Sequence, residues 1–152
     1  MKGACIFLTA VFFMVFGVPF SGGAQGDYVG TETCGDCHEY EYDNFMEYSK
    51  KPYSWEHITK MRPKLKDSEF KECLECHTTG YERGGFVSYE ETPELADVGC
   101  ETCHGPGEEH VETGGDPAAI KGRISQEDCQ RCHNEARVED FNFKPLIYGG
   151  VH

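Results

Sequence analysis

The chain has 152 residues, of which 27 are acidic and 14 are Lys or Arg, so its formal charge at pH 7 is −13. Such an acidic protein repels the phosphate backbone, which excludes nucleic acid as a natural partner, and it disfavours binding to an anionic membrane surface. The charge suits docking to a basic patch on another protein, or it serves only to keep this protein in solution. Both interpretations stay open at this stage.

Residues 1–24 are typical of a secretory signal. Lys2 supplies the positive charge, residues 6–18 form an apolar run, and residues 22–24 (Gly-Gly-Ala) fit a small-residue cleavage site. The run is too short for a comfortable membrane span, so we expect a cleaved signal rather than an uncleaved anchor. This predicts a single domain over residues 25–152, without stable membrane insertion, in the periplasm; an extracellular or outer-surface location is the alternative.

The elements expected along residues 25–152 are short helices. Residues 39–51 form a plausible helix that Pro52 must end, and Ser54 is expected to cap a second helix that runs to Met61. Asp67 or Ser68 is expected to cap a third helix.

Further along, residues 80–85 and 105–115 are expected to be glycine-rich loops, and the run Ser125-Gln126-Glu127-Asp128 favours a capping box at the start of a last helix. No convincing strand is present, so the sequence predicts a mostly α fold with little β structure.

The pentad Cys-x-x-Cys-His occurs four times in the chain. It is the attachment signature of a c-type haem, in which two thiols form thioethers to one porphyrin and the adjacent His binds the iron as proximal ligand. The sequence therefore predicts four covalently bound haem c groups. Their attachment residues are Cys34, Cys37 and His38; Cys73, Cys76 and His77; Cys100, Cys103 and His104; and Cys129, Cys132 and His133.

Two other kinds of protein site use paired cysteines, and both are alternatives to haem attachment here. A thioredoxin-type dithiol needs no His after every second Cys, and a zinc site needs two pairs to converge. Four intact pentads favour haem over both. Cys5 lies within the predicted signal, and the pentads use all of the remaining cysteines. None is therefore left for a structural disulfide.

The chain after the signal has few long apolar runs, so the porphyrin faces must supply much of the buried apolar surface. We expect a small, irregular multihaem cytochrome c fold that is organised around its four haems. A chain that depends on its cofactors in this way has no folded apo form.

Axial ligands can be counted from the histidines. Seven are present, and four belong to the pentads, which leaves His57, His110 and His152 as candidate distal ligands. Full bis-histidine ligation of four haems needs eight, so one haem lacks a His from this chain. That haem is open, or it binds Met46 or Met61, a Lys, or a His from another subunit.

Several segments resemble the tetrahaem cytochromes of the cytochrome c-554 type. They are residues 28–30, residues 76–81 followed by 84–86, residues 98–107 with His110 close behind, and residues 141–152. The third of these is the most specific, because it contains a complete pentad followed by Gly-Pro-Gly.

The resemblance implies a ligand pairing out of chain order. His110 would lie opposite His38, and His152 opposite His104. A ligand that follows the first pentad would lie opposite His133, and the haem on His77 would be open. In relatives the ligand after the first pentad occupies the register of Lys50 in this chain, whereas His57 lies two turns beyond it. The fourth haem therefore takes His57, takes Lys50, or borrows a ligand.

These features together predict an electron carrier rather than an enzyme. It would relay single electrons between redox partner proteins with basic docking surfaces, through haems of low potential because no Met ligand raises them. One alternative is a small nitrogen-oxide or hydroxylamine-type reductase at the open haem, where Tyr81 and Glu82 are the obvious polar groups and no basic cluster is evident. Another is a subunit of an extracellular cytochrome filament.

Overall fold

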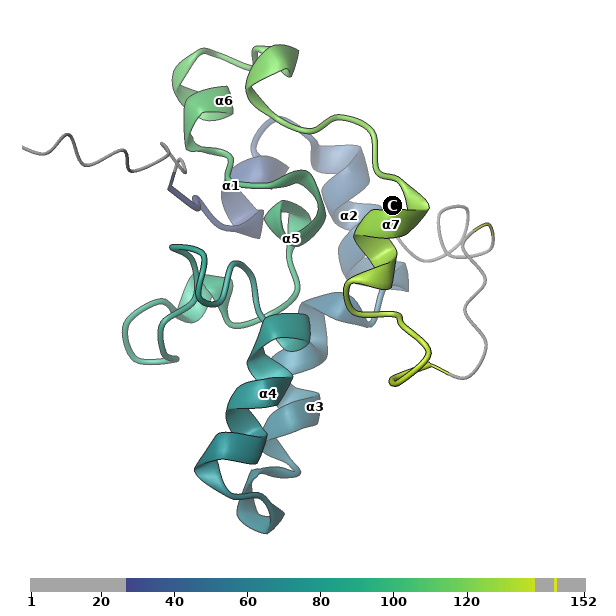
Figure 1. The fold of residues 1–152 in the computed structure, drawn as a ribbon. Helices are drawn as coiled ribbons and strands as arrows, with labels where there is room; N and C mark the ends of the chain where they lie inside the picture. The colour runs from purple at the N-terminus through teal and green to yellow at the C-terminus, as the bar shows by residue number, and fades with distance from the viewer. Residues whose placement is uncertain (1–26, 139–143, 145–152) are drawn as a thin grey trace, which may run out of the picture.

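The computed structural model describes residues 27–138 and residue 144, and its helices are joined by loops without any strand in that part of the chain (Figure 1). The predicted mostly α class is confirmed. The predicted signal at residues 1–24 lies outside the described residues. The helices in chain order are α1 (Thr31–Gly35), α2 (Glu39–Tyr48), η1 (Lys51–Tyr53), α3 (Ser54–Thr59), η2 (Arg62–Lys64), α4 (Asp67–His77), η3 (Pro93–Leu95), α5 (Cys100–His104), α6 (Glu108–Glu112), η4 (Pro117–Ala119) and α7 (Gln126–Gln130).

The apolar core lies beside α3 and α4, which pack side by side (Figure 1). Trp55 packs against this core, and its ring centroid lies 5.3 Å from that of Phe86 and 5.5 Å from that of Tyr89. Its buried members are few: Ile58, Leu74, Phe86, Leu95 and Ala96. A core of this size covers little of the apolar surface that a domain needs, which agrees with a fold that depends on bound cofactors.

The break between α2 and α3 is where expectation and structure differ in detail. Helix α2 ends at Tyr48, three residues short of the predicted end, and Pro52 lies within the short helix η1. Ser54 is not a cap, because Tyr53 holds that position. The Ser54 hydroxyl instead donates to the His77 carbonyl at 2.9 Å and accepts the Val98 N–H at 2.9 Å, so it joins three segments in the interior.

The glycine-rich loop at residues 80–85 is confirmed. Its backbone turns back on itself, because the N–H groups of Arg83 and Gly85 both donate to the Gly80 carbonyl. Gly80 has a φ of 71°, and a Cβ there would meet the Tyr28 ring at 2.5 Å. Only glycine satisfies both the backbone angle and the close approach.

The loop predicted at residues 105–115 contains a helix. Helix α6 follows Gly107, and two acidic residues occupy its first turn, where carboxylates stabilise the helix dipole. The backbone of Asp27 accepts the Glu108 N–H, which holds the start of α6 against the N-terminal segment. The glycine content of the segment hid this short helix from a reading of the sequence.

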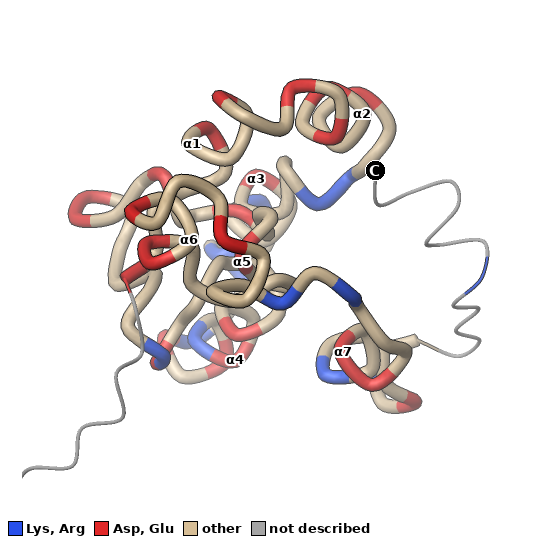
Figure 2. The backbone as a smooth tube through the Cα atoms, turned by 90° about the horizontal axis from the view of Figure 1, so that it is seen from above, with Lys and Arg blue, Asp and Glu red and all other residues tan. Residues whose placement is uncertain are grey.

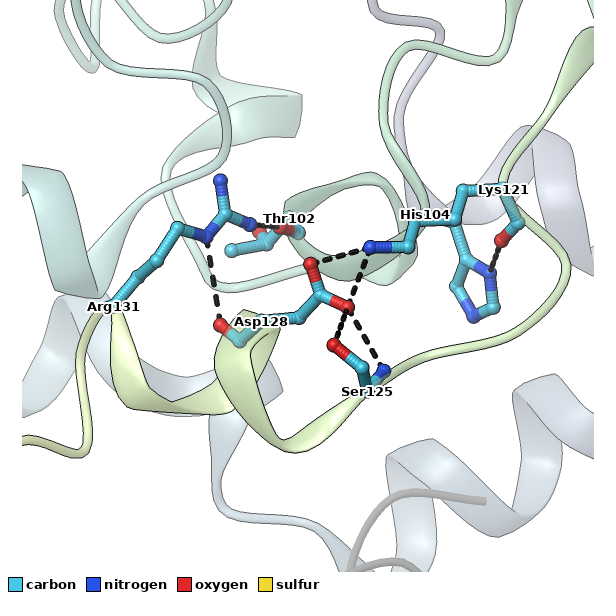
Figure 3. Close-up of polar contacts among 6 residues, drawn as sticks. All are labelled: Thr102, His104, Lys121, Ser125, Asp128 and Arg131. Carbon is cyan, nitrogen blue, oxygen red and sulfur yellow. Dashed lines mark hydrogen bonds and ion pairs between the residues drawn. The ribbon is translucent and has the colours of Figure 1, made fainter.

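At α7 the predicted capping arrangement is confirmed. The Asp128 carboxylate accepts the Ser125 backbone N–H at 2.8 Å and the Ser125 hydroxyl at 2.9 Å, as Figure 3 shows. Lys121 pairs with the same carboxylate at 2.5 Å, and Arg131 donates to the Thr102 carbonyl at 3.0 Å. These contacts fix α7 against the segment that follows α5.

Acidic positions outnumber basic ones over the molecule and occur on α1, α2, α4 and α6 as well as α7 (Figure 2). Among the described residues, the helices are all too short or too polar to cross a membrane.

Candidate functional site

Each pentad is carried by a short helix or by its end. The second lies in the last turn and a half of α4, and the third makes up all of α5. The first begins in α1 and the fourth in α7. Two residues three positions apart share one face of a helix, so the thiols of a Cys-x-x-Cys pair can reach the same porphyrin edge.

The first and third pentads meet through their leading cysteines. The thiols of Cys34 and Cys100 are hydrogen-bonded, and this bond lowers the pKa of Cys100 to about 7 while it raises the pKa of Cys34 well above its usual range. Thr31 also stabilises the Cys100 thiolate. The attachment points of the first and third haems are therefore neighbours in space.

The second and fourth pentads meet in the same way. Burial first, and then a hydrogen bond with Cys76, raise the pKa of Cys132 to about 12. The structure thus pairs the first pentad with the third and the second with the fourth. No group of three or more His, Cys, Asp or Glu side chains in the described part of the chain is placed to hold one metal ion.

His38 and His110 face each other. Their ring centroids are 6.2 Å apart, and their planes are inclined by 18°. Imidazole nitrogens bind transition metals at about 2 Å, and the centroid lies roughly 1 Å farther away, so two imidazoles on opposite sides of one iron have centroids about 6 Å apart. The centroid spacing matches this value, and iron binding would also require an Nε2 of each ring to point towards the shared iron. The pairing implied by the resemblance stays a prediction that this geometry favours.

Two histidines are oriented by backbone carbonyls. His110 Nδ1 donates to the Asp116 carbonyl at 2.8 Å, and His104 Nδ1 donates to the Lys121 carbonyl at 2.6 Å (the latter in Figure 3). A metal-binding imidazole commonly donates its second N–H in this way, which fixes the ring and leaves Nε2 for the metal. Both side chains therefore have the form that an axial ligand requires.

A cavity of about 750 Å³ is bordered by the other three pentads. Its lining includes Cys76, His77, Cys103, His104, Cys129 and His133. Burial is the main cause that lowers the pKa of both His77 and His133, which keeps each imidazole neutral, as metal ligation demands. Nδ1 of His77 is buried and has no hydrogen-bond partner. Neutral histidines, thiols and an apolar cavity together fit haem c groups.

The other candidate distal ligands differ in whether they border this cavity. His57 is exposed and borders the cavity beside the second pentad, where its charge lowers the pKa of His77. Met61 is 55% exposed, and Met46 borders a separate cavity of about 280 Å³. His152 lies outside the described residues.

Three basic residues of the cavity wall were not singled out from the sequence. Lys51 borders it next to the fourth pentad, one position after the Lys50 that the family register indicates. Arg83 and Arg137 also border it, and the charge of Arg137 contributes to the lowered pKa of His77, so single basic side chains lie near the second pentad although no basic cluster was evident from the sequence. Tyr81, which was expected near that haem, packs against the apolar core, as does Cys73 of the second pentad. Only the fold shows which of these cations lie together.

Comparisons with known proteins agree with the site. Residues 33–105 match the family model described as cytochrome c554 and c-prime. Cytochrome c-554 of Nitrosomonas europaea is 30% identical over 95 residues, which cover 55% of this chain and 40% of that protein, so the match spans less than half of the relative. No solved structure matches. Residues 33–105, which contain the first three pentads, are therefore similar to the cytochrome c554 family, and this similarity implies haem c and multihaem electron transfer.

Proposed function

We propose that this protein is a tetrahaem electron carrier that relays single electrons between redox partner proteins in the periplasm. The observation that carries the proposal is the contact between pentads that are distant in the sequence, Cys34 with Cys100 and Cys76 with Cys132. When haem is bound, each of these sulfurs is joined to the edge of a porphyrin, and the haem supplies the one-electron chemistry. Contacting sulfurs therefore hold two porphyrin edges close together.

The two pairs are connected through the cavity. Its wall contains residues of the second, third and fourth pentads, and the third pentad is also paired with the first. Each haem, once attached, would thus have the attachment residues of another haem beside it. This continuity supports a relay, which needs no substrate site.

The cations of the cavity have a role in the same proposal. Arg83, Arg131 and Arg137 border a space that would hold haems, and each haem brings two propionate carboxylates. Guanidinium groups bind carboxylates through paired, charge-assisted hydrogen bonds. We assign these arginines to propionate binding, where they offset negative charge that the acidic chain would otherwise repel.

The acidic surface suggests the kind of partner. With a net charge of −13, the protein is attracted to a redox protein whose docking surface is basic. The periplasmic location rests on the predicted signal at residues 1–24.

One observation favours a second function. Arg83 and Arg137 border the cavity with His77, whose haem is the one predicted to be open, and cations beside an open iron suit a small anion such as nitrite. A nitrogen-oxide or hydroxylamine-type reductase is therefore the alternative.

The holoprotein tests both functions. In a reductive titration the holoprotein should take up four electrons per chain, one for each pentad. The rate at which a basic cytochrome c reduces the holoprotein should fall steeply as salt is added, because screening weakens the attraction between opposite charges. Sustained turnover with nitrite or hydroxylamine would instead establish the reductase, and a salt-independent rate would remove the basic partner. Size-exclusion chromatography separates a carrier from a filament subunit.

A further inference from the structure

We propose that Lys51 is the distal axial ligand of the haem attached at Cys129 and Cys132, on the side opposite His133. This inference rests on the proposed haem-binding function. It concerns the fourth haem, for which the sequence left His57, Lys50 or a borrowed ligand, and it assigns a different residue.

The backbone between α2 and α3 places Lys51 at the cavity. Helix α2 ends at Tyr48, and buried Ser49 accepts the Lys51 backbone N–H through its hydroxyl at 3.2 Å. Pro52, within the short helix η1, restricts the backbone directly after Lys51. Lys50 and Lys51 both border the cavity, but Lys50 is exposed whereas Lys51 is half-buried.

The electrostatic contacts of Lys51 lie with the third and fourth pentads. The Lys51 ammonium lies within the field of Cys103 and Cys129, and among the proximal histidines its charge adds to burial in lowering the pKa of His133. His57, in contrast, acts on His77 of the second pentad. His57 thus lies beside the second haem, and Lys51 is the half-buried candidate beside the fourth, whereas Lys50 is exposed.

The chemistry of lysine fits an interior position of this kind. An amine binds iron through its lone pair, so the ammonium releases its proton to solvent when the bond to iron forms, and the oxidation state of the iron is unchanged. Lys51 is half-buried in the cavity wall, and burial disfavours a charged ammonium relative to a neutral amine. Its four-carbon stem gives the reach that an imidazole at the same backbone position would lack.

With this assignment, three of the four haems have a distal ligand from this chain. His110 faces His38, His152 is expected opposite His104, and Lys51 would complete the haem on His133. Only the haem on His77 then lacks a distal ligand from this chain, as the resemblance implies.

The test uses the oxidised holoprotein. Near-infrared magnetic circular dichroism distinguishes amine–imidazole from bis-imidazole ligation, and we expect an amine–imidazole band in the wild type. Lys51→Ala should lose that band and gain one high-spin haem by EPR, whereas the neighbouring Lys50→Ala should keep the wild-type spectra. Because an imidazole at this position lacks the reach of lysine, Lys51→His should also lose the amine–imidazole band and gain one high-spin haem.

Wild-type spectra in Lys51→Ala, or a new high-spin signal in Lys50→Ala instead, would overturn the assignment. If Lys51→Ala fails to mature, Lys51→His decides: an unchanged amine–imidazole band there rejects Lys51. A haem count by the pyridine haemochrome method separates this inference from the proposed function, because four haems per chain with an unchanged Lys51→Ala spectrum would reject only the ligand.

Discussion

The carboxylate of Glu101 accepts the backbone N–H of Gly30 at 2.8 Å. It also accepts the N–H of Val29 at 3.0 Å and that of Gly107 at 2.7 Å, and the Glu101 residue is only 2% exposed. Glu101 stands between the two cysteines of the third pentad, so one side chain joins a haem-attachment helix to the N-terminal segment and to the start of α6.

We therefore predict that Glu101→Ala is strongly destabilising. It leaves three backbone donors without their charged acceptor, and the loss of free energy of unfolding should be about 3–5 kcal/mol. Denaturant titration of the holoprotein measures it. Glu108→Ala is the matched control, because Glu108 accepts one exposed N–H from Asp27 at 3.1 Å and should cost less than about 1 kcal/mol. Equal losses in the two variants would contradict this account.

The number of haems follows from the pentads. Mass spectrometry and the pyridine haemochrome assay should find four covalent haems per mature chain, because four complete pentads are present. The fourth pentad lies outside the residues that match the family model, so its haem is the most informative. A fully matured protein with three haems would remove the predicted role of Cys129 and Cys132.

His110 should be a distal ligand of the first haem. His110→Ala removes the ring that faces His38 at 6.2 Å, so one low-spin haem should become high-spin in the EPR spectrum of the oxidised protein. Val111→Ala, which changes an exposed neighbour on the same helix, should leave the spectrum unchanged. An unaltered spectrum in His110→Ala would mean that the facing rings do not share an iron.

The second haem should be open. The wild-type spectrum should contain one high-spin haem, and because His57 is exposed at the rim of the cavity, His57→Ala should not add another. Exogenous cyanide should convert the high-spin signal to low-spin without changing the other haems. A second high-spin signal in His57→Ala would show instead that His57 binds an iron.

Asp128 should make α7 sensitive to acid. Its hydrogen bond with Lys121, and then that with the Ser125 backbone, lower its pKa from 3.8 to about 2. A group whose pKa is lower in the folded state stabilises above its unfolded value, and this stabilisation disappears as the pH falls through the folded value. The contribution is thus complete above about pH 4 and is lost towards pH 2.

Comparison with Asp128→Asn measures this contribution. At pH 6 the variant should be less stable by about 1 kcal/mol, the usual cost of losing a cap, and the difference should shrink as the pH falls from 4 to 2. Thermal melting followed by circular dichroism at several pH values gives both quantities. Glu135→Gln changes an exposed carboxylate beyond the fourth pentad and should show no such trend. A difference that stays constant with pH would rule out the capping role of the ionised carboxylate.

The features that could be predicted from the sequence are those that depend only on residues close together in the chain. The pentads, the capping residues Ser125 and Asp128, and the turn at Gly80 follow from neighbouring residues alone. The sequence did not predict α6, because a helix of five residues has almost no periodicity to detect. Nor could it place Lys51 or Arg83 at the cavity, since their positions depend on where α2 ends and how the chain returns.

The contacts between Cys34 and Cys100 and between Cys76 and Cys132 have a consequence for the order of folding and haem attachment. Each contact joins pentads that are distant in the sequence, so it exists only in the folded chain, and folding is expected to require haem. If such thiols met while still free, they could oxidise to a disulfide, which would remove one sulfur from each of two pentads. Attachment of haem before the chain folds would keep all four sulfurs available for thioethers.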